Sequence, residues 1–545
     1  MPLRTARMCL WGLAALAAAQ PAANASDTPF SIGIEMPCQV PVTPAVESAL
    51  RDMGIDYINY YVKPWTATPE EEAVAANREM MAFTERMDLD FALSCYVADP
   101  PETAVREAVA AGPRFKGIVF DELAHCRLLN LHEGTEPLAD PAALHDLPQA
   151  YGATLNGYRR LYERFAALGA PVTATHVWPV LHHVSARAGF NPCPKICKEF
   201  YSPISLAIGL GAALQYGREL TVDCDLWYYD LVPGHTPEEF KSNLLLAYWL
   251  GADRLYVEGS GHNLTEVGKQ GIPFSLMTQI TPERYQLTAH GEVLRWFTES
   301  YLPAHPRPWT FRDITPDVAI VRFPDSCYGQ TYVEDGGWDW HAGLYGAKAI
   351  PSTEDTRAWF GLWNLLTCGV SGHDGITFFS KYIAAAGYER PVKDNLSQSL
   401  YSRPVQADSH RFFVPLRGVV VFDHLAGYEH LKDIPVICLT GVAVSDSSMA
   451  AVRRRVEEGA TCVIWGNLAR KLGFTDYGAG YDERPYGQGK FVLTDDFSKG
   501  RVWQTCWPQM ARPDEIDYRF GANRVVLKRV TDNEVDVRIV SPDGA

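Results

Sequence analysis

Two glutamates stand where apolar, strand-like stretches of the sequence end. Residues 254–258 read Arg-Leu-Tyr-Val-Glu and run directly into glycine, and residues 115–122 read Phe-Lys-Gly-Ile-Val-Phe-Asp-Glu. Runs of this composition are typical of buried strands, so Glu258 and Glu122 are predicted at strand ends. A carboxylate in such a place is costly unless it is paired or used. Two carboxylates that face each other across a glycosidic bond are the groups that double-displacement hydrolysis requires.

Other polar residues near predicted strand ends are candidates for substrate binding. Asp223 and Asp225 share one face of a predicted strand and form a rival carboxylate pair, which with the histidines would suit a metal-dependent hydrolase. The motifs of zincins, phosphate-binding loops and nucleophilic serines are absent, so no cofactor and no metal is expected. The candidate binding residues, several of them aromatic as sugar sites often are, are Glu35, Asn59, Tyr61, Asp121, His176, Trp178, Asp225, Trp227, Trp338 and Trp340.

The elements that must position these residues alternate between strand-like and helix-like segments from about residue 28 to about residue 308. Helices of ten or more residues between strands indicate a parallel sheet, and seven repeats favour a (β/α)8 barrel over an open sheet. Glu122 then ends the fourth strand and Glu258 the seventh, and the eighth is placed at 272–277 before a long helix over 282–301. The seven predicted strands cover 30–36, 56–62, 90–97, 115–122, 171–178, 220–227 and 254–258.

Three prolines at 303, 306 and 308 mark a predicted domain boundary. Strands at 317–323, 375–380, 418–423, 435–439 and 461–465, with helices at 353–367 and 445–459, predict a second α/β domain of flavodoxin-like or amidotransferase-like type. The alternating tail predicts a small C-terminal β domain. The predicted fold is therefore α/β, a (β/α)8 TIM barrel with two further domains. The predicted division is 1–25 signal peptide, 26–310 catalytic barrel, 311–480 second domain and 481–545 β domain.

Glutamates ending the fourth and seventh strands of a barrel resemble the large retaining clan that includes the family 42 β-galactosidases and the family 164 β-mannosidases. The order of domains, and the helix and strand at 445–466, are also similar to theirs. The resemblance implies a retaining exo-β-glycosidase with Glu122 as acid/base and Glu258 as nucleophile, and a trimer held by the second domain. In a trimer, Trp338 and Trp340 could reach a neighbouring site.

The sequence departs from that clan at Asp121, where most members have an asparagine that contacts the sugar 2-hydroxyl. The departure puts that contact and the family placement in question. An aspartate beside Glu122 would also raise the pKa of the glutamate by like-charge repulsion, which suits a general acid.

The first 25 residues have the composition of a signal peptide. Arg4 and Arg7 precede an apolar run over 8–19, and small residues at 23–25 offer a cleavage site, so a secreted or periplasmic protein is expected. No stretch is long enough to span a membrane. The net charge of −16 argues against nucleic acid and anionic membranes as partners and fits a neutral or cationic substrate. The resemblance implies that this substrate is an oligo- or polysaccharide. A non-catalytic carbohydrate-binding or scaffold protein on a degenerate barrel is the second alternative.

Two of the cysteines are close together in the sequence. Cys193 and Cys197, in Asn-Pro-Cys-Pro-Lys-Ile-Cys, are the pair that we expect to form a local disulfide. The same spacing would suit half of a metal site, but no second half with matching spacing follows.

Overall fold

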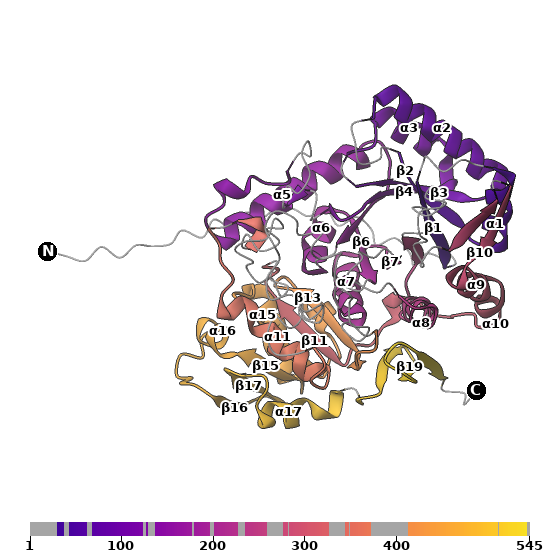
Figure 1. Ribbon diagram of the computed structural model, residues 1–545. Coiled ribbons are helices and arrows are strands. Elements are labelled where there is room, and N and C mark those ends of the chain that lie inside the picture. The colour runs from indigo at the N-terminus through magenta and orange to yellow at the C-terminus, as the bar shows by residue number, and fades with distance from the viewer. Residues whose placement is uncertain are drawn as a thin grey trace, which may run out of the picture.

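The computed structural model describes residues 30–37, 43–62, 68–96, 98–123, 127–128, 137–176, 179–196, 201–226, 235–258, 276–281, 283–325, 344–347, 349–371, 412–510 and 512–541. Eight parallel strands close into a barrel in sequence order (Figure 1). They are β1 (Ser31–Pro37), β2 (Tyr57–Tyr61), β3 (Asp90–Cys95), β4 (Phe115–Phe120), β5 (Val172–His176), β6 (Asn191–Ile196), β7 (Thr221–Asp225) and β8 (Arg254–Glu258). The predicted (β/α)8 barrel is confirmed.

Helices surround the barrel, and their first residues explain where several of them begin. The side chains of Thr43, Asp146 and Thr236 accept hydrogen bonds from backbone N–H groups in the first turn, and a proline follows in each first turn. These helices are α1 (Pro44–Asp52), α2 (Glu70–Met87), α3 (Glu102–Ala110), α5 (Leu147–Ala166), α6 (His182–Ala188), α7 (Ser202–Tyr216) and α8 (Pro237–Trp249). None of the helices in the described part of the chain is long and apolar enough to cross a membrane.

The barrel strand that sequence patterns miss is β6, Asn191–Ile196. Two prolines and a lysine hide it, because proline is rare inside sheets and the segment has few apolar residues. Pro192 and Pro194 are register partners of the outward Ala174 and His176 on β5, and a Cβ on Gly209 of α7 would lie 2.7 Å from Pro194 Cγ. Pro194 therefore packs against a helix, and the alternate residues, with Cys193 and Lys195 among them, point into the barrel.

The extra strand changes the numbering of everything after it. Glu258 ends the eighth strand and not the seventh, and Asp225 ends the seventh. The strand placed at 272–277 is wrong: β9 (Met277–Thr281) pairs antiparallel with β10 (Arg284–Leu287) in a separate two-stranded sheet. The long helix predicted over 282–301 begins only after β10, as α9 (Ala289–Arg295), the π-helical turn Trp296–Tyr301 and α10 (Leu302–Ala304).

After the barrel, the chain builds a six-stranded sheet in the order β13-β11-β14-β15-β17-β16, parallel except for β16. Its strands are β11 (Val318–Arg322), β13 (Val419–Asp423), β14 (Val436–Thr440), β15 (Thr461–Trp465), β16 (Tyr481–Tyr486) and β17 (Gly489–Thr494), with helices α11 (Glu354–Leu366), α14 (Tyr428–Leu431), α15 (Asp446–Glu457), α16 (Gly466–Lys471) and α17 (Gly500–Cys506). The predicted α/β character of the second domain holds in this sheet.

The C-terminal sheet has four strands: β12 (Leu416–Arg417), β18 (Glu515–Phe520), β19 (Asn523–Arg529) and β20 (Val535–Val540). The predicted division at 481 does not follow these sheets. Strands β16 and β17 join β15, and β12 is supplied from within the second domain. Sequence alternation identifies strands in this tail but does not say which sheet each strand joins. The predicted strand at 375–380 and the predicted signal peptide lie outside the described residues.

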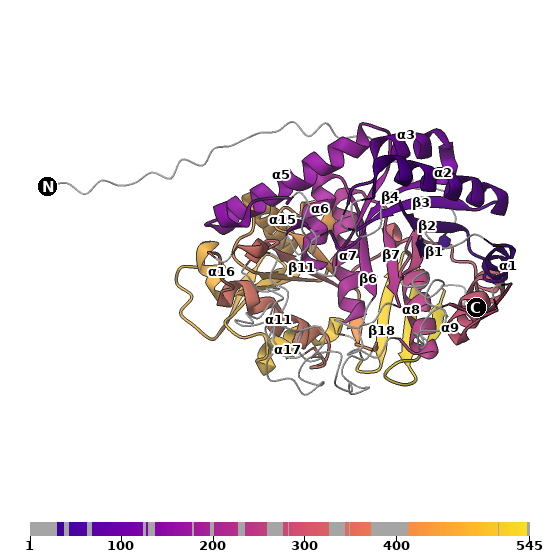
Figure 2. The ribbon, with the colours of Figure 1, turned by 45° about the horizontal axis from the view of Figure 1, so that its top comes forward.

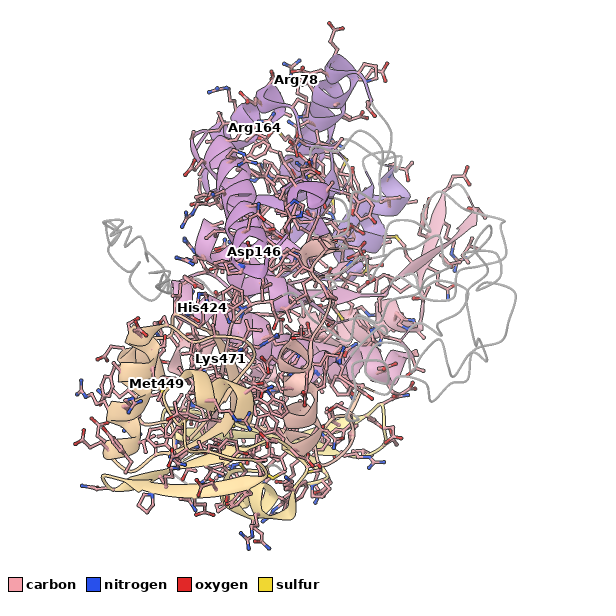
Figure 3. The ribbon with its side chains drawn as sticks, turned by 90° about the vertical axis from the view of Figure 1, so that its left-hand side faces the viewer. Arg78, Asp146, Arg164, His424, Met449 and Lys471 are labelled. Atoms are coloured by element: carbon pink, nitrogen blue, oxygen red, sulfur yellow. The ribbon has the colours of Figure 1, made fainter. Side chains whose placement is uncertain are left out.

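The barrel and the six-stranded sheet are packed tightly together. Helix α7 stands between β6 and β13 (Figure 1), and a Cβ on Gly211 would lie 1.7 Å from the Val421 carbonyl oxygen. Helix α5 runs along the barrel toward the second domain (Figure 2), and His424 lies at the junction (Figure 3), where its ring meets those of Tyr151 and Phe323. The closeness at Gly211 leaves no room for any larger residue.

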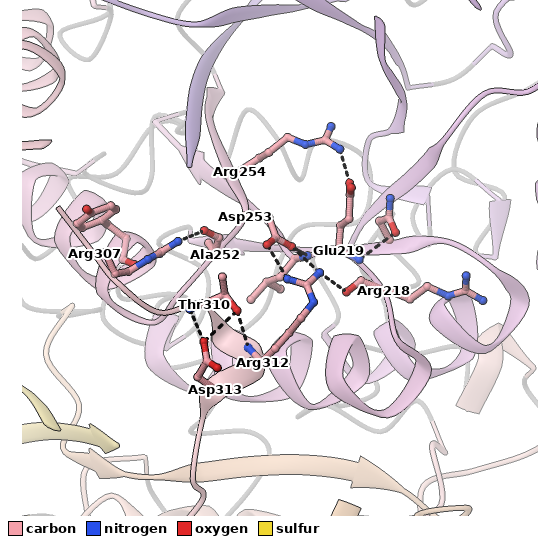
Figure 4. A network of polar contacts seen from close by, with 12 residues as sticks. Arg218, Glu219, Ala252, Asp253, Arg254, Arg307, Thr310, Arg312 and Asp313 are labelled. Atoms are coloured by element: carbon pink, nitrogen blue, oxygen red, sulfur yellow. Dashed lines mark hydrogen bonds and ion pairs between the residues drawn. The ribbon is translucent and has the colours of Figure 1, made fainter. Parts of the chain in front are cut away.

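The N-terminal end of the barrel is fixed by a network of paired charges (Figure 4). Arg312 holds Asp253 through two hydrogen bonds of 2.8 and 3.1 Å, and Asp253 also accepts from the backbone N–H of Leu220. Arg254 at the start of β8 pairs with Glu219. This network joins the barrel floor to the segment that leads into the second domain.

Candidate active site

The opposite, C-terminal end of the barrel gathers a buried cluster of charges around Lys195 of β6. Its Nζ lies 2.7 Å from Glu258, 3.0 Å from Glu122, 3.4 Å from Asp121, 3.5 Å from Asp225 and 3.8 Å from Asp223. We call these five carboxylates the acidic cluster. They come from the ends of β4, β7 and β8, which is where barrel enzymes place their active sites. Sequence reasoning missed Lys195 because it lies in the strand that the two prolines disguise.

Glu122 is held from three sides. Its backbone has a positive φ of 43°, and its N–H donates to Thr175 Oγ1 at 2.7 Å. The Tyr96 hydroxyl donates to Glu122 Oε2 at 3.0 Å, while Lys195 donates to Oε1 at 3.0 Å. A left-handed backbone at a residue other than glycine costs on the order of 1 kcal/mol and is typical of functional sites. Both carboxylate oxygens of Glu122 are thus fixed by donors that favour the ionised form.

Asp121 serves mainly to hold its neighbours in place. Its two oxygens accept from the Tyr61 hydroxyl at 3.0 Å and from Thr175 Oγ1 at 2.8 Å. Burial, followed by the charges of Asp121 and Glu35, raises the pKa of Tyr61 well above its usual value, so the phenol stays protonated and donates. The predicted contact of Asp121 with a sugar stays untested, and its visible partners are protein groups.

Two carboxyl groups of the cluster, those of Glu258 and Asp223, have raised pKa values. Burial, and after it the charge of Asp121, raises the pKa of Glu258 to about 7 although Lys195 opposes the rise. Burial and the neighbouring charge of Glu258 raise the pKa of Asp223 well above its usual value. A proton is therefore available in this part of the cluster near neutral pH, as general acid catalysis needs.

Lys195 remains an ammonium. Burial alone would lower its pKa, but the charges of Asp121, Glu122, Glu258 and Asp225 together raise that pKa well above the usual value. An ammonium donates hydrogen bonds and is not a nucleophile, so covalent catalysis through the Lys195 amine is not supported.

The five carboxylates of the acidic cluster differ in exposure. The side chains of Glu122 and Glu258 are 14% and 10% exposed, whereas those of Asp225, Asp121 and Asp223 are 5%, 4% and 0% exposed. Glu122 and Glu258 are therefore the members of the cluster that face the opening of the barrel. We call them the carboxylate pair.

Glu35 and Asn59 line the same end of the barrel from β1 and β2. They are register partners on neighbouring strands, and one oxygen each of Glu35, Asp121 and Glu258 lie within 4.8 Å of one another. The side-chain amide of Asn59 is fully buried and has no hydrogen-bond partner among the described residues. The carboxylate oxygens of Glu35, Asp121 and Glu258 would suit a hard divalent cation. The ammonium of Lys195 already contacts two of these residues, Asp121 and Glu258.

The remaining predicted site residues do not join this group. His176 on β5 points outward to the helices, where its Nε2 lies 3.0 Å from Ser185 Oγ and its ring meets those of His182 and Tyr158. His176 therefore lies away from the acidic cluster, because the inward residue at that strand end is Thr175. The rival metal site that joins Asp223 and Asp225 to histidines is likewise not assembled by His176 or His182. Trp178, Trp227, Trp338 and Trp340 lie outside the described residues.

The predicted disulfide of Cys193 with Cys197 is wrong, because Cys193 is not bonded to another cysteine. Cys193 is a free, buried cysteine inside β6, in contact with other residues of the barrel interior. Its predicted partner, Cys197, lies outside the described residues.

Comparison with known proteins gives fold-level likenesses only. The chain matches no family model and no curated protein. Among solved structures, it is similar to the exo-beta-1,4-mannosidase Op5Man5 from Opitutaceae bacterium strain TAV5, with 11% identity and a TM-score of 0.46 over 88% of this chain and 93% of that one.

Two further likenesses are weaker. An enzyme described as a GH138 enzyme targeting pectin rhamnogalacturonan II has 10% identity and a TM-score of 0.29 over 52% of this chain and 40% of that one. A phospho-2-dehydro-3-deoxyheptonate aldolase from Thermotoga maritima has 13% identity and a TM-score of 0.28 over 51% and 70% of the two chains. Likenesses at this level carry no functional argument, so membership in family 42 or 164 stays a prediction.

Proposed function

We propose that the protein is a retaining exo-β-glycosidase that acts on β-mannosides or β-galactosides through the carboxylate pair. One observation carries the proposal. Lys195 Nζ contacts Glu122 Oε1 at 3.0 Å and Glu258 Oε2 at 2.7 Å, so the two oxygens lie at most about 5.7 Å apart, the sum of those distances. Retaining enzymes separate their carboxyl groups by about 5–5.5 Å, and inverting enzymes by about 6.5–9.5 Å.

The contacts support roles for the pair that are the reverse of those expected from the resemblance. The resemblance gives Glu258 the nucleophile's role as the end of a seventh strand, but Glu258 ends β8. Glu122 accepts one hydrogen bond on each oxygen, from Lys195 and from Tyr96, an arrangement that suits the group that attacks the anomeric carbon. Glu258, with its pKa near 7, suits the group that protonates the leaving oxygen and then activates water.

A panel of aryl β-glycosides tests the activity, and proton NMR of the first product tests its stereochemistry. The proposal expects hydrolysis of a β-mannoside or a β-galactoside, with a β-configured sugar released first. Release of the α-configured sugar would contradict the retaining mechanism. Activity that EDTA abolishes and Mg²⁺ or Ca²⁺ restores would instead favour the metal-dependent alternative at Glu35, Asp121 and Glu258.

Azide separates the two roles within the pair. Glu122→Ala with azide is expected to form an α-glycosyl azide, because azide attacks directly in place of the missing nucleophile. Glu258→Ala with azide is expected to form a β-glycosyl azide, because azide then intercepts the glycosyl-enzyme. The opposite pattern would restore the roles that the resemblance implies.

Export and assembly belong to the same proposal and rest on the sequence. Mass spectrometry of the protein after expression in a bacterium with a periplasm is expected to find a mature N-terminus at Ser26. Light scattering would test the homotrimer. A chain that keeps Met1, or a monomer in solution, would remove the corresponding part of the proposal.

A further inference from the structure

Lys195 is placed where it touches both members of the carboxylate pair. It lies on β6, two strands from β4 on one side and two strands from β8 on the other, and its side chain is 1% exposed. Its two shortest contacts, of 2.7 and 3.0 Å, are those to Glu258 and Glu122, and the other three carboxylates lie farther away. The ammonium donates a hydrogen bond to Glu122 Oε1 and forms an ion pair with Glu258 Oε2.

The surroundings of Lys195 fix the position of its ammonium. The strand that carries it is held on two sides, because Pro194 packs on α7 and Lys195 is the register partner of Asp223 on β7. Burial removes the rotamer freedom that a lysine side chain has at a surface. The ammonium is thus a rigid reference point between the two glutamates, which come from strands on either side of β6.

We propose that Lys195 is the positioning residue of this site, and that its ammonium sets the separation of Glu122 and Glu258 and fixes one oxygen of Glu122 for attack. The inference rests on the proposed function. It also assigns Tyr96 a matching part, because Tyr96 holds the second oxygen of Glu122 while Lys195 holds the first. Without the ammonium, like-charge repulsion within the cluster would favour protonation of Glu122 and push the pair apart.

Lys195→Met tests the proposal because methionine has a similar length and no charge. We expect kcat to fall by about 100-fold or more with KM changed by less than about threefold. The acidic limb of the pH profile of kcat/KM should move to higher pH, because the nucleophile then ionises less readily. A variant with the kcat and the pH profile of the wild type would overturn the proposal.

Two companion variants separate positioning from folding. Lys116→Met is the matched control, since Lys116 lies on β4 at the other end of the barrel and pairs with Asp90 at 2.6 Å; it should keep kcat and the pH profile. If Lys195→Met does not fold, the double variant Lys195→Met/Asp225→Asn removes the ammonium together with one carboxylate that it pairs with, and is expected to fold. Its pH profile should still be shifted, and an unshifted profile would count against the proposal.

Amine rescue adds a readout that a merely structural lysine would not give. Ethylammonium is expected to raise the kcat of Lys195→Ala at least tenfold, whereas ethanol at the same concentration should leave that kcat unchanged. Equal effects of both, or no effect of either, would contradict a role for the charge.

A last measurement distinguishes failure of this inference from failure of the proposed function. If the wild type hydrolyses no glycoside, the infrared carboxyl band can still be titrated in wild type and in Lys195→Met. More protonated carboxyl at pH 7 in the variant would support the effect of Lys195 on the cluster while the glycosidase proposal fails. Identical titrations would overturn the inference itself.

Discussion

The two ends of the barrel differ in how their charged residues are paired. At the N-terminal end, Arg312 and Asp253 form a two-bonded pair and Arg254 pairs with Glu219, so positive and negative groups match (Figure 4). At the C-terminal end, Lys195 is the cation that touches all five members of the acidic cluster in the described part of the chain. The first arrangement secures the fold, whereas the second concentrates like charge where water is scarce.

The difference teaches which buried charges are structural. At the crowded end, burial and then the neighbouring carboxylates raise the pKa of Glu258 to about 7 and that of Asp223 well above its usual value. The chain also accepts a left-handed backbone at Glu122 in the crowded end. A protein keeps such unfavourable features where they serve chemistry, so substitutions at the two ends should have opposite effects on stability and on activity.

The largest expected effect is on activity at the crowded end. Glu122→Gln and Glu258→Gln should each lower kcat by about 10³-fold or more, because each removes one half of the acid and nucleophile pair. At pH 7.5 their free energies of unfolding should equal or exceed that of the wild type, since a buried like charge is removed. Kinetics with an aryl glycoside and urea denaturation check both parts. A large loss of stability would contradict the contrast between the two ends.

A smaller effect is expected in the pH dependence of stability. Glu258 has a pKa near 7 in the folded chain against 4.5 as its ordinary value. The folded state therefore holds the proton more tightly, and the free energy of unfolding should fall by on the order of 3 kcal/mol as pH rises from about 4.5 to about 7. Urea denaturation across this range should show the fall in wild type and a smaller fall in Glu258→Gln, where Asp223 still contributes.

The control for that measurement is Glu107→Gln on the exposed pair with Arg78, which should leave the slope as in the wild type. A Glu258→Gln variant with an unchanged slope would show that Glu258 is not the source of the pH dependence of stability.

The smallest expected effect is at the matched end. Arg312→Leu should lower the free energy of unfolding by about 2 kcal/mol, because it leaves Asp253 partly buried without its partner. The kcat of the folded enzyme should stay within about twofold of the wild type. Arg312→Lys keeps the charge but not the two-bonded geometry, and should lose less stability. A drop in kcat comparable to that of the glutamine variants would contradict the distinction between a structural end and a functional end of the barrel.

Much of the fold follows from the sequence, and the errors have physical causes. Seven of the eight barrel strands can be recognised in the sequence, because strands that are buried on both faces are usually rich in apolar residues. The strand β6 escapes this rule, since its inward side carries Asn191, Cys193 and Lys195 and its outward side carries prolines. One missed strand was enough to move Glu258 from the eighth position to the seventh.

The site could be predicted only in part for a related reason. Strand-end carboxylates stand out in the sequence because a charge after an apolar run is unusual, and Glu122 and Glu258 do meet at one ammonium. Which residue of a strand end points inward depends on the register, and a shift of one residue exchanged His176 for Thr175. Lys195 on β6 and Tyr96, which follows β3, both contact Glu122, and a local sequence pattern does not predict contacts between residues so far apart in the chain.

Covalent trapping tests the central claim most directly. The wild-type enzyme would be incubated with a 2-deoxy-2-fluoro-β-glycoside of the sugar that it hydrolyses, digested, and examined by mass spectrometry. The account predicts one added glycosyl unit on the peptide that contains Glu122, and a label on Glu258 would keep the pair but exchange its roles. A label on Asp223 or Asp225, or turnover of the reagent without any adduct, would contradict the claim that Glu122 and Glu258 form the catalytic pair.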